Sequence, residues 1–312
     1  MIYTVTFNPA IDKTAEVDQL IVGGLNRLAN IRQDAAGKGI NVSKTLKSMG
    51  ISSICTGFLA GDTGQWIESA IQKMGIETRF FWVDGQTRTN LKVLNAQMEL
   101  TELNEPGPEV HENAILKLLG FLNENIQPKD VVVLSGNVSP GVSKDIYRRI
   151  IEQVHAAKGQ VILDADGDLF AQGLSARPDV IKPNAYELGQ YFGLETEPDV
   201  QEAIALARKL LNEDTRLVVV SRGSKGSLFV TEKEGFVVDA LKIEFHSAVG
   251  AGDAMVTGLA RALAEEMNLE QTIDLAVALS AGACMTKGTQ PADLKVVEEL
   301  KKKVKKEKAY EN

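Results

Sequence analysis

Short apolar segments alternate with helical segments along most of this chain. Apolar, β-branched runs occur at 2–7, 53–59, 131–134, 161–163, 179–184 and 216–221. Between them lie stretches whose apolar residues recur at helical spacing, among them 37–50, 64–74, 110–124, 143–157 and 199–212. Strands that are apolar throughout are typical of a parallel sheet with helices on both faces. The sequence therefore predicts an α/β fold with a central, mostly parallel sheet that binds ligands at the carboxyl ends of its strands.

Two segments do not follow this alternation of strands and helices. Residues 15–34 and 78–108 are rich in β-formers and lack helical spacing, which is typical of strand pairs with one polar face. We expect one domain of residues 1–312 that carries a small β-sheet lid built from about 12–34 and 78–104. Residues 226–230 and 235–240 indicate a hairpin. Helices are predicted at 251–265, 269–286 and 293–306, the last with its lysines on a solvent-exposed face.

The net charge, the lengths of the apolar runs and the spacing of histidines and cysteines argue against several classes of function. The formal net charge is −8, whereas nucleic-acid-binding proteins usually carry a basic face. No apolar run approaches the roughly 20 residues of a membrane helix, and the N-terminus lacks the pattern of a signal peptide. The three histidines and two cysteines show no zinc-binding spacing. We therefore expect a cytoplasmic protein that binds neither nucleic acid nor membranes.

The segment SAVGAGDAMVTG (247–258) places glycines where they are poor helix formers, at the start of an apolar helical stretch. A glycine-rich helix start exposes several backbone N–H groups and forms an anion site. Gly250, Ala251 and Gly252 are predicted to surround a phosphate. Asp253 would then accept a proton from a hydroxyl that attacks this phosphate. The structural alternative is a tightly packed helix start with an acidic first turn.

A second glycine turn precedes an earlier helix. The segment AAGKGINVSK (35–44) carries Gly37, Lys38, Gly39 and Asn41, and it lacks the spacing of a Walker A loop. A lysine between glycines suits a second phosphate or a sugar hydroxyl. The alternative is a plain turn at the start of a helix.

Further segments match known motifs in order along the chain: FNPAID (7–12), GQTRTN (85–90), LSGNVSPGV (134–142), KPNAYEL (182–188) and SRGSKG (221–226). With the two glycine turns, they resemble the motifs of the ribokinase-like (PfkB) carbohydrate kinase family. The opening T-x-N-P-A-x-D and the A-G-K-G-I-N-V segment resemble bacterial kinases of phosphorylated ketohexoses, closest to the 1-phosphofructokinase branch. Two single residues and two segments depart from the family pattern: Ala248, Arg222, the SGNVS turn at 135–139 and DADG at 164–167.

The resemblance implies ATP-dependent phosphorylation of the 6-hydroxyl of fructose 1-phosphate, with Asp253 as general base and the amides of 250–252 as anion hole. Its implied substrate-binding residues are Asp12, Gly37, Lys38, Gly39, Asn41, Arg88, Asn90 and Arg27. Its implied nucleotide-binding residues are Lys182, Asn184, Ser221, Arg222, Gly223, Ser224, Lys225, Gly226 and Gly252. Glu187 would hold Mg²⁺ indirectly. Lys38 and Arg88 together would bind the phosphate that the sugar already carries.

Other functions stay open. Tagatose 6-phosphate and fructose 6-phosphate are alternative substrates within the family, and a non-catalytic sugar-phosphate sensor is an alternative from another class. A dinucleotide-dependent enzyme would need G-x-G-x-x-G after the first strand, where this chain has FNPAIDK. The resemblance also implies a homodimer formed through the lid, with Arg27 either reaching substrate phosphate or lying exposed.

Overall fold

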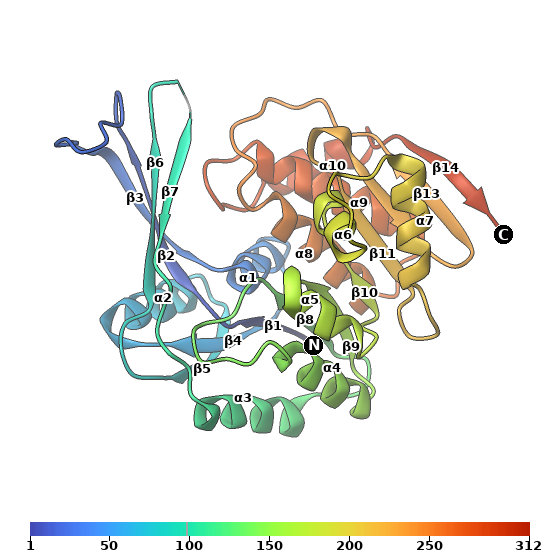
Figure 1. Cartoon of the computed structure of the whole chain (residues 1–312), viewed down its shortest axis with the longest axis horizontal. Helices are drawn as coiled ribbons and strands as arrows, with labels where there is room; N and C mark the ends of the chain where they lie inside the picture. The colour runs from blue at the N-terminus through green and yellow to red at the C-terminus, as the bar shows by residue number, and fades with distance from the viewer. Residues whose placement is uncertain (98) are drawn as a thin grey trace.

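A computed structural model describes residues 1–97 and 99–312, which form two β-sheets and surrounding helices (Figure 1). From edge to edge, the large sheet contains β14 (Lys306–Glu311), β13 (Glu234–Val238), β12 (Ser227–Val230), β11 (Leu217–Ser221), β10 (Val180–Ile181), β9 (Gln160–Asp164), β8 (Val131–Ser135), β1 (Ile2–Thr6), β4 (Ile54–Leu59) and β5 (Glu77–Trp82). The strands from β5 to β11 pair in parallel, and β12, β13 and β14 continue the sheet antiparallel. The predicted mostly parallel sheet and the hairpin are confirmed.

Helices cover both faces of this sheet because its central strands are apolar on both sides. In β8, Val131 and Val133 face one core while Val132 and Leu134 face another. The first core is covered by α1 (Lys38–Ser48), α8 (Ala251–Ala264) and α9 (Leu269–Cys284), with α10 (Leu294–Lys301) against α9. The opposite core is covered by α3 (Glu112–Asn125), α4 (Ile146–Ala156), α5 (Gly167–Leu174), α6 (Ala185–Tyr191) and α7 (Val200–Leu210). Helix α2 (Gly61–Lys73) packs beside β4 and β5.

The second sheet projects to one side of the molecule (Figure 1) and is called here the small sheet. Its strand order is β3 (Ala29–Ala36), β2 (Ala10–Glu16), β6 (Arg88–Leu94) and β7 (Leu100–Asn104). The prediction that all of 78–104 belongs to the lid is wrong, because β5 lies at the edge of the large sheet, parallel to β4. Phe80 of β5 is buried among side chains of β4 and α2, so its apolar side chain determines where the strand packs.

The C-terminal segment also differs from the prediction. Helix α10 ends at Lys301, although Val304 continues the helical spacing, and residues 306–311 form β14 along the edge of β13. The ring of Tyr310 lies over Gly235, and the Arg208 guanidinium lies 4.3 Å from the centre of that ring. Lys306 and Lys308 pair with carboxylates of neighbouring elements. The open edge of β13 thus outweighs a weak helical pattern.

None of the helices in the described residues is both long enough and apolar enough to cross a lipid bilayer. The carboxyl ends of β8, β9 and β11 and the starts of α1 and α8 carry most of the candidate residues considered next.

Candidate active site

The buried carboxylate of Asp164, at the carboxyl end of β9, forms ion pairs with two lysines. Asp164 Oδ1 lies 3.0 Å from Lys182 Nζ, and Asp164 Oδ2 accepts hydrogen bonds from Ser135 Oγ at 2.8 Å and Lys38 Nζ at 3.2 Å. Burial alone would raise the pKa of Asp164, but the ammonium groups of Lys182 and Lys38 outweigh it and hold this pKa well below its usual range. The Lys38 side chain remains 44% exposed, in contrast to the buried side chains of Asp164 and Lys182.

The start of α8 has the geometry expected of an anion site. Gly250 is the N-cap with φ of 82°, a left-handed conformation that favours glycine, and Ala251 begins the helix. A Cβ added to Gly252 would lie 3.8 Å from Lys182 Nζ. The Ala251 N–H donates to the carbonyl oxygen of Ala248 at 3.3 Å, whereas the N–H groups of Gly250 and Gly252 have no backbone acceptor among the described residues. The free N–H groups of these two glycines therefore lie close to the Lys182 ammonium group, which Asp164 holds. An anion at this point would meet both backbone donors and a positive charge.

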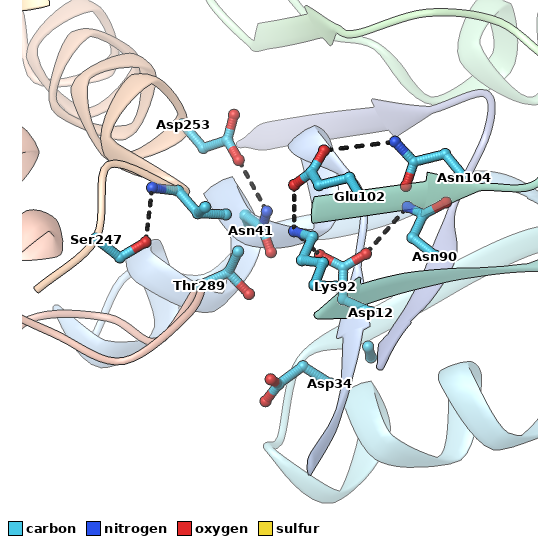
Figure 2. A network of polar contacts seen from close by, with 12 residues as sticks. Asp12, Asp34, Asn41, Asn90, Lys92, Glu102, Asn104, Ser247, Asp253 and Thr289 are labelled. Carbon is cyan, nitrogen blue, oxygen red and sulfur yellow. Dashed lines mark hydrogen bonds and ion pairs between the residues drawn. The ribbon is translucent and has the colours of Figure 1, made fainter. Parts of the chain in front are cut away.

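Asp253 follows directly in the first turn of α8 and is 8% exposed. Its Oδ2 accepts a hydrogen bond of 2.8 Å from Nδ2 of Asn41, which lies on α1 (Figure 2). Burial raises the pKa of the Asp253 carboxyl to about 6, although Lys38 and the Asn41 amide favour its ionised form. A carboxyl with such a pKa can take up a proton near neutral pH and release it again.

The polar face of the small sheet brings a second set of residues together. Asp12 of β2 lies opposite Asn90 of β6, and its Oδ1 accepts a hydrogen bond of 3.0 Å from Asn90 Nδ2. Its Oδ2 accepts a hydrogen bond of 2.7 Å from Lys92 Nζ, which also lies 3.7 Å from Glu102 Oε1 of β7. Figure 2 shows this network beside the Asp253–Asn41 pair. The sequence analysis predicted Asp12 and Asn90 but missed Lys92.

Arg88, at the start of β6, is held by backbone oxygens. Its guanidinium donates to the carbonyl oxygen of Asn8 at 3.0 Å and to that of Glu105 at 3.2 Å. Burial lowers its pKa, although Asp12 and Glu105 favour the charged form. The arginine is thus fixed close to the network around Asp12.

Several buried polar atoms in this region have no hydrogen-bond partner among the described residues. They include Asn41 Oδ1, Asn90 Oδ1 and Arg88 Nε. Unpaired buried polar groups are costly, so such atoms usually meet water or a ligand. Two free acceptors and one free donor, together with the Asp12 carboxylate, suit a ligand rich in hydroxyl groups.

The predicted nucleotide-binding segments lie side by side at the ends of β10 and β11. Asn184 and Glu187 form a capping box at the start of α6, and Asn184 bridges to Ser221 of β11. The turn that follows contains Arg222, Gly223, Ser224, Lys225 and Gly226. Burial raises the pKa of Glu187, although the Asn184 N–H and Lys182 oppose that shift.

Three predicted cationic residues, Lys38, Arg88 and Arg27, differ in the contacts that hold them. Lys38, which was predicted to bind the sugar phosphate together with Arg88, forms an ion pair with Asp164, the carboxylate that also pairs with Lys182. Arg88 contacts the backbone oxygens of Asn8 and Glu105. Arg27 is exposed in the connection between β2 and β3, and the described residues give it no ion pair or side-chain hydrogen bond. The two glycines that flank Lys38 explain the tight entry to α1, since a Cβ on Gly39 would lie 2.5 Å from Thr6 Oγ1.

The comparisons with known proteins all match carbohydrate or sugar-phosphate kinases. A family model described as pfkB family carbohydrate kinase matches residues 5–295. The chain is 32% identical over 303 residues to 1-phosphofructokinase of Bacillus subtilis, covering 96% of this chain and 99% of that protein. It is 30% identical over 306 residues to tagatose-6-phosphate kinase of Staphylococcus epidermidis, covering 97% and 98%. Its fold is similar to phosphofructokinase-2 from Escherichia coli in complex with fructose-6-phosphate, with a TM-score of 0.90, 25% identity and coverage of 97% and 98%.

Proposed function

Because the chain belongs to the pfkB family of carbohydrate kinases, we propose that it transfers the γ-phosphoryl group of ATP to the 6-hydroxyl of fructose 1-phosphate. The products are fructose 1,6-bisphosphate and ADP. The observation that carries this proposal is the buried Asp253 carboxyl at a glycine-rich helix start, next to a pair of lysines. A relative named 1-phosphofructokinase, aligned over nearly the whole chain, supports the choice of substrate.

Asp253 is the proposed general base. With a pKa of about 6, its carboxyl is mostly ionised at neutral pH and accepts the proton of the attacking hydroxyl as the new P–O bond forms. The hydrogen bond from Asn41 fixes one carboxylate oxygen, Oδ2, so that Oδ1 remains available for the hydroxyl. Burial keeps this base out of water and therefore raises its basicity.

The start of α8 is the proposed anion hole for the transferring phosphoryl group. The N–H groups of Gly250 and Gly252 are free of backbone acceptors among the described residues, and Lys182 lies beside Gly252. The Ala251 N–H, which donates to Ala248 at 3.3 Å, would have to exchange this partner for the phosphoryl group. Charge builds up on the phosphoryl oxygens and the leaving oxygen during transfer, so preorganised donors lower the barrier. We propose that Lys38 also stabilises the negative charge of the transferring phosphoryl group, because Asp164 forms ion pairs with both Lys182 and Lys38.

The sugar is proposed to lie between α1 and the small sheet. The carboxylate of Asp12 and the free amide oxygens of Asn41 and Asn90 would accept hydrogen bonds from its hydroxyl groups. Arg88 supplies the nearby cation for the phosphate that the sugar already carries. The small sheet would act as a lid that excludes water and limits wasteful hydrolysis of ATP.

ATP and Mg²⁺ are the proposed co-substrate and metal ion. The described residues contain no group of three or more acidic, histidine or cysteine side chains that could hold a metal by themselves, so the ion would arrive with the nucleotide. Glu187 uses Oε2 to accept the Asn184 N–H, which leaves Oε1 for an indirect contact, through water, with the ion. Bound Mg²⁺ would neutralise charge on the ATP phosphates. The 221–226 turn and Asn184 would contact the nucleotide.

Tagatose 6-phosphate is the second candidate substrate, because one relative at 30% identity is named as its kinase. A panel of fructose 1-phosphate, tagatose 6-phosphate and fructose 6-phosphate with Mg-ATP tests both candidates by kcat/KM. We expect the highest kcat/KM for fructose 1-phosphate. A higher value for either of the other two would refute the substrate assignment.

A homodimer through the small sheet is proposed as the working assembly. Every residue of the edge strand β7 is exposed, and Ile31, Leu100 and Leu103 of the small sheet are large, exposed apolar residues. Exposed strand edges tend to pair with another chain. In such a dimer, Arg27 could reach the partner's substrate phosphate. Light scattering of wild type against Leu103→Glu tests the dimer, which the variant should weaken.

A further inference from the structure

A separate cavity of about 490 Å³ lies between strand β3, helices α1 and α2 and the segment 290–291. Its volume falls within the range of about 300 to 1,000 Å³ that is usual for small-molecule sites. None of the residues that line it is among those proposed above for catalysis, sugar binding or nucleotide binding. The cavity therefore needs an explanation of its own.

Lys44 is the most unusual residue in the wall of this cavity. It is 6% exposed, and its Nζ donates only to the backbone oxygen of Ala35 at 3.2 Å and to Thr289 Oγ1 at 3.4 Å. Both acceptors are uncharged, and within the described residues Lys44 forms no ion pair. Burial lowers its pKa, although the carboxylates of Asp34 and Asp12 oppose that shift. A buried ammonium group is normally paired with an anion, because desolvation of a lone charge is costly.

The remaining charges of the cavity favour a ligand with a single phosphate group. Lys47 lies one helical turn after Lys44 on α1, lines the same cavity and is exposed. Asp34 also lines the cavity, but its Oδ2 already accepts a hydrogen bond of 2.8 Å from Arg32. Two lysines and one neutralised carboxylate match one phosphate better than a triphosphate, which would bring excess negative charge next to Asp34.

The opposite part of the wall is apolar and partly exposed. Trp66 of α2 and Met74 line the cavity and are 39% and 46% exposed. An indole face of this kind stacks well on an aromatic ring. The cavity thus combines cations on α1 with an aromatic surface on α2.

We propose that this cavity binds a small molecule that carries one phosphate group and an aromatic ring. The phosphate contacts Lys44 and Lys47, and the ring packs on Trp66. The site touches the catalytic region through Thr289, because a Cβ on Gly250 would lie 3.5 Å from the Cα of Thr289. Gln290 and Pro291 also line a second cavity, of about 10 Å³, which reaches Asn41 and Gly250.

The test uses the fluorescence of Trp66. The sequence contains two tryptophans, so Trp82→Phe leaves Trp66 as the single reporter. The full-length W82F variant is titrated with AMP, with adenosine and with inorganic phosphate, while saturating Mg-ATP fills the proposed nucleotide site. We expect a saturable change with AMP and weaker binding of adenosine and of phosphate, since each lacks half of the recognised groups.

Lysine variants in the W82F background identify the site. Lys44→Met should weaken AMP binding by about tenfold or more, the loss expected for a charge-assisted contact, and Lys47→Ala should weaken it by a smaller factor. Lys73→Ala is the matched control, because Lys73 is exposed at the end of α2 and does not line the cavity. Thermal unfolding checks that K44M folds. If K44M does not fold, the AMP affinity of K47A alone tests whether the lysines bind the phosphate.

Three results would overturn the proposal. The first is the absence of any saturable Trp66 signal with AMP at millimolar concentrations. The second is equal AMP affinity in W82F and in its lysine variants. The third is binding of inorganic phosphate as tight as that of AMP, which would leave no role for the aromatic wall.

Discussion

Replacing Asp253 with asparagine should remove nearly all kinase turnover and yet make the protein more stable at neutral pH. Asparagine has almost the same shape and can still accept the hydrogen bond from Asn41, so the site should keep its geometry. It cannot accept a proton. General-base catalysis contributes about 10²- to 10⁴-fold, and we expect kcat to fall by at least about a hundredfold.

The stability change follows from the pKa of the same carboxyl. This pKa rises from 3.8 to about 6 in the folded protein, so the folded state binds the proton more tightly than the unfolded state does. The stability of the wild type therefore falls as the pH rises from about 4 to about 6, by up to about 3 kcal/mol for this group. The Asp253→Asn variant does not lose this stability, because its amide does not ionise. Its gain in free energy of unfolding should be present at about pH 7 and disappear near pH 4.

Two assays measure these effects. A coupled assay for ADP release gives kcat, and in the wild type the activity should rise with pH through an apparent pKa near 6. Urea unfolding at several pH values gives the free energy of unfolding. Asp168→Asn is the matched control, because Asp168 is an exposed acidic residue in the first turn of α5. Near-normal turnover of D253N would refute the base assignment, and a variant less stable than wild type at neutral pH would refute the electrostatic argument.

Three further predictions concern the small sheet and the C-terminal strand. Lys92→Met should raise the KM for the sugar phosphate by about tenfold, because Asp12 loses the ammonium that orients it, while the KM for ATP stays unchanged. Lys92→Arg should restore part of the loss, and equal effects of both variants on both substrates would argue against this role. Arg88→Ala should raise the KM for the sugar phosphate by about tenfold or more, and an unchanged value would mean that the phosphate lies elsewhere. Tyr310→Ala should lower the free energy of unfolding by about 1–3 kcal/mol, because it removes the ring between Gly235 and Arg208; unchanged urea unfolding would contradict the packing of β14.

The sequence was sufficient for the features that depend on local pattern. The apolar strands predicted the parallel sheet, and the glycine turns predicted the starts of α1 and α8. The family resemblance, carried by motifs spread over most of the chain, is confirmed by the family model that matches residues 5–295. Motifs of this kind are readable because each one needs particular residue types within a few positions of one another.

The features that the sequence did not reveal depend on pairing between distant segments. Lys92 meets Asp12 only because β2 and β6 pair in parallel with Asp12 opposite Asn90, a register that neither strand specifies by itself. Lys38 was assigned from its position in a glycine turn, but its ion pair is determined by Asp164 at the end of β9. The tail became a strand because β13 offers an open edge, which is a property of the assembled sheet.

One measurement tests the central claim most directly: ³¹P NMR of the products formed from fructose 1-phosphate, Mg-ATP and the wild-type chain. The account predicts that ATP is converted to ADP while a second phosphate ester appears on the sugar at carbon 6. Release of inorganic phosphate without a new ester, or a complete lack of ATP consumption, would contradict it.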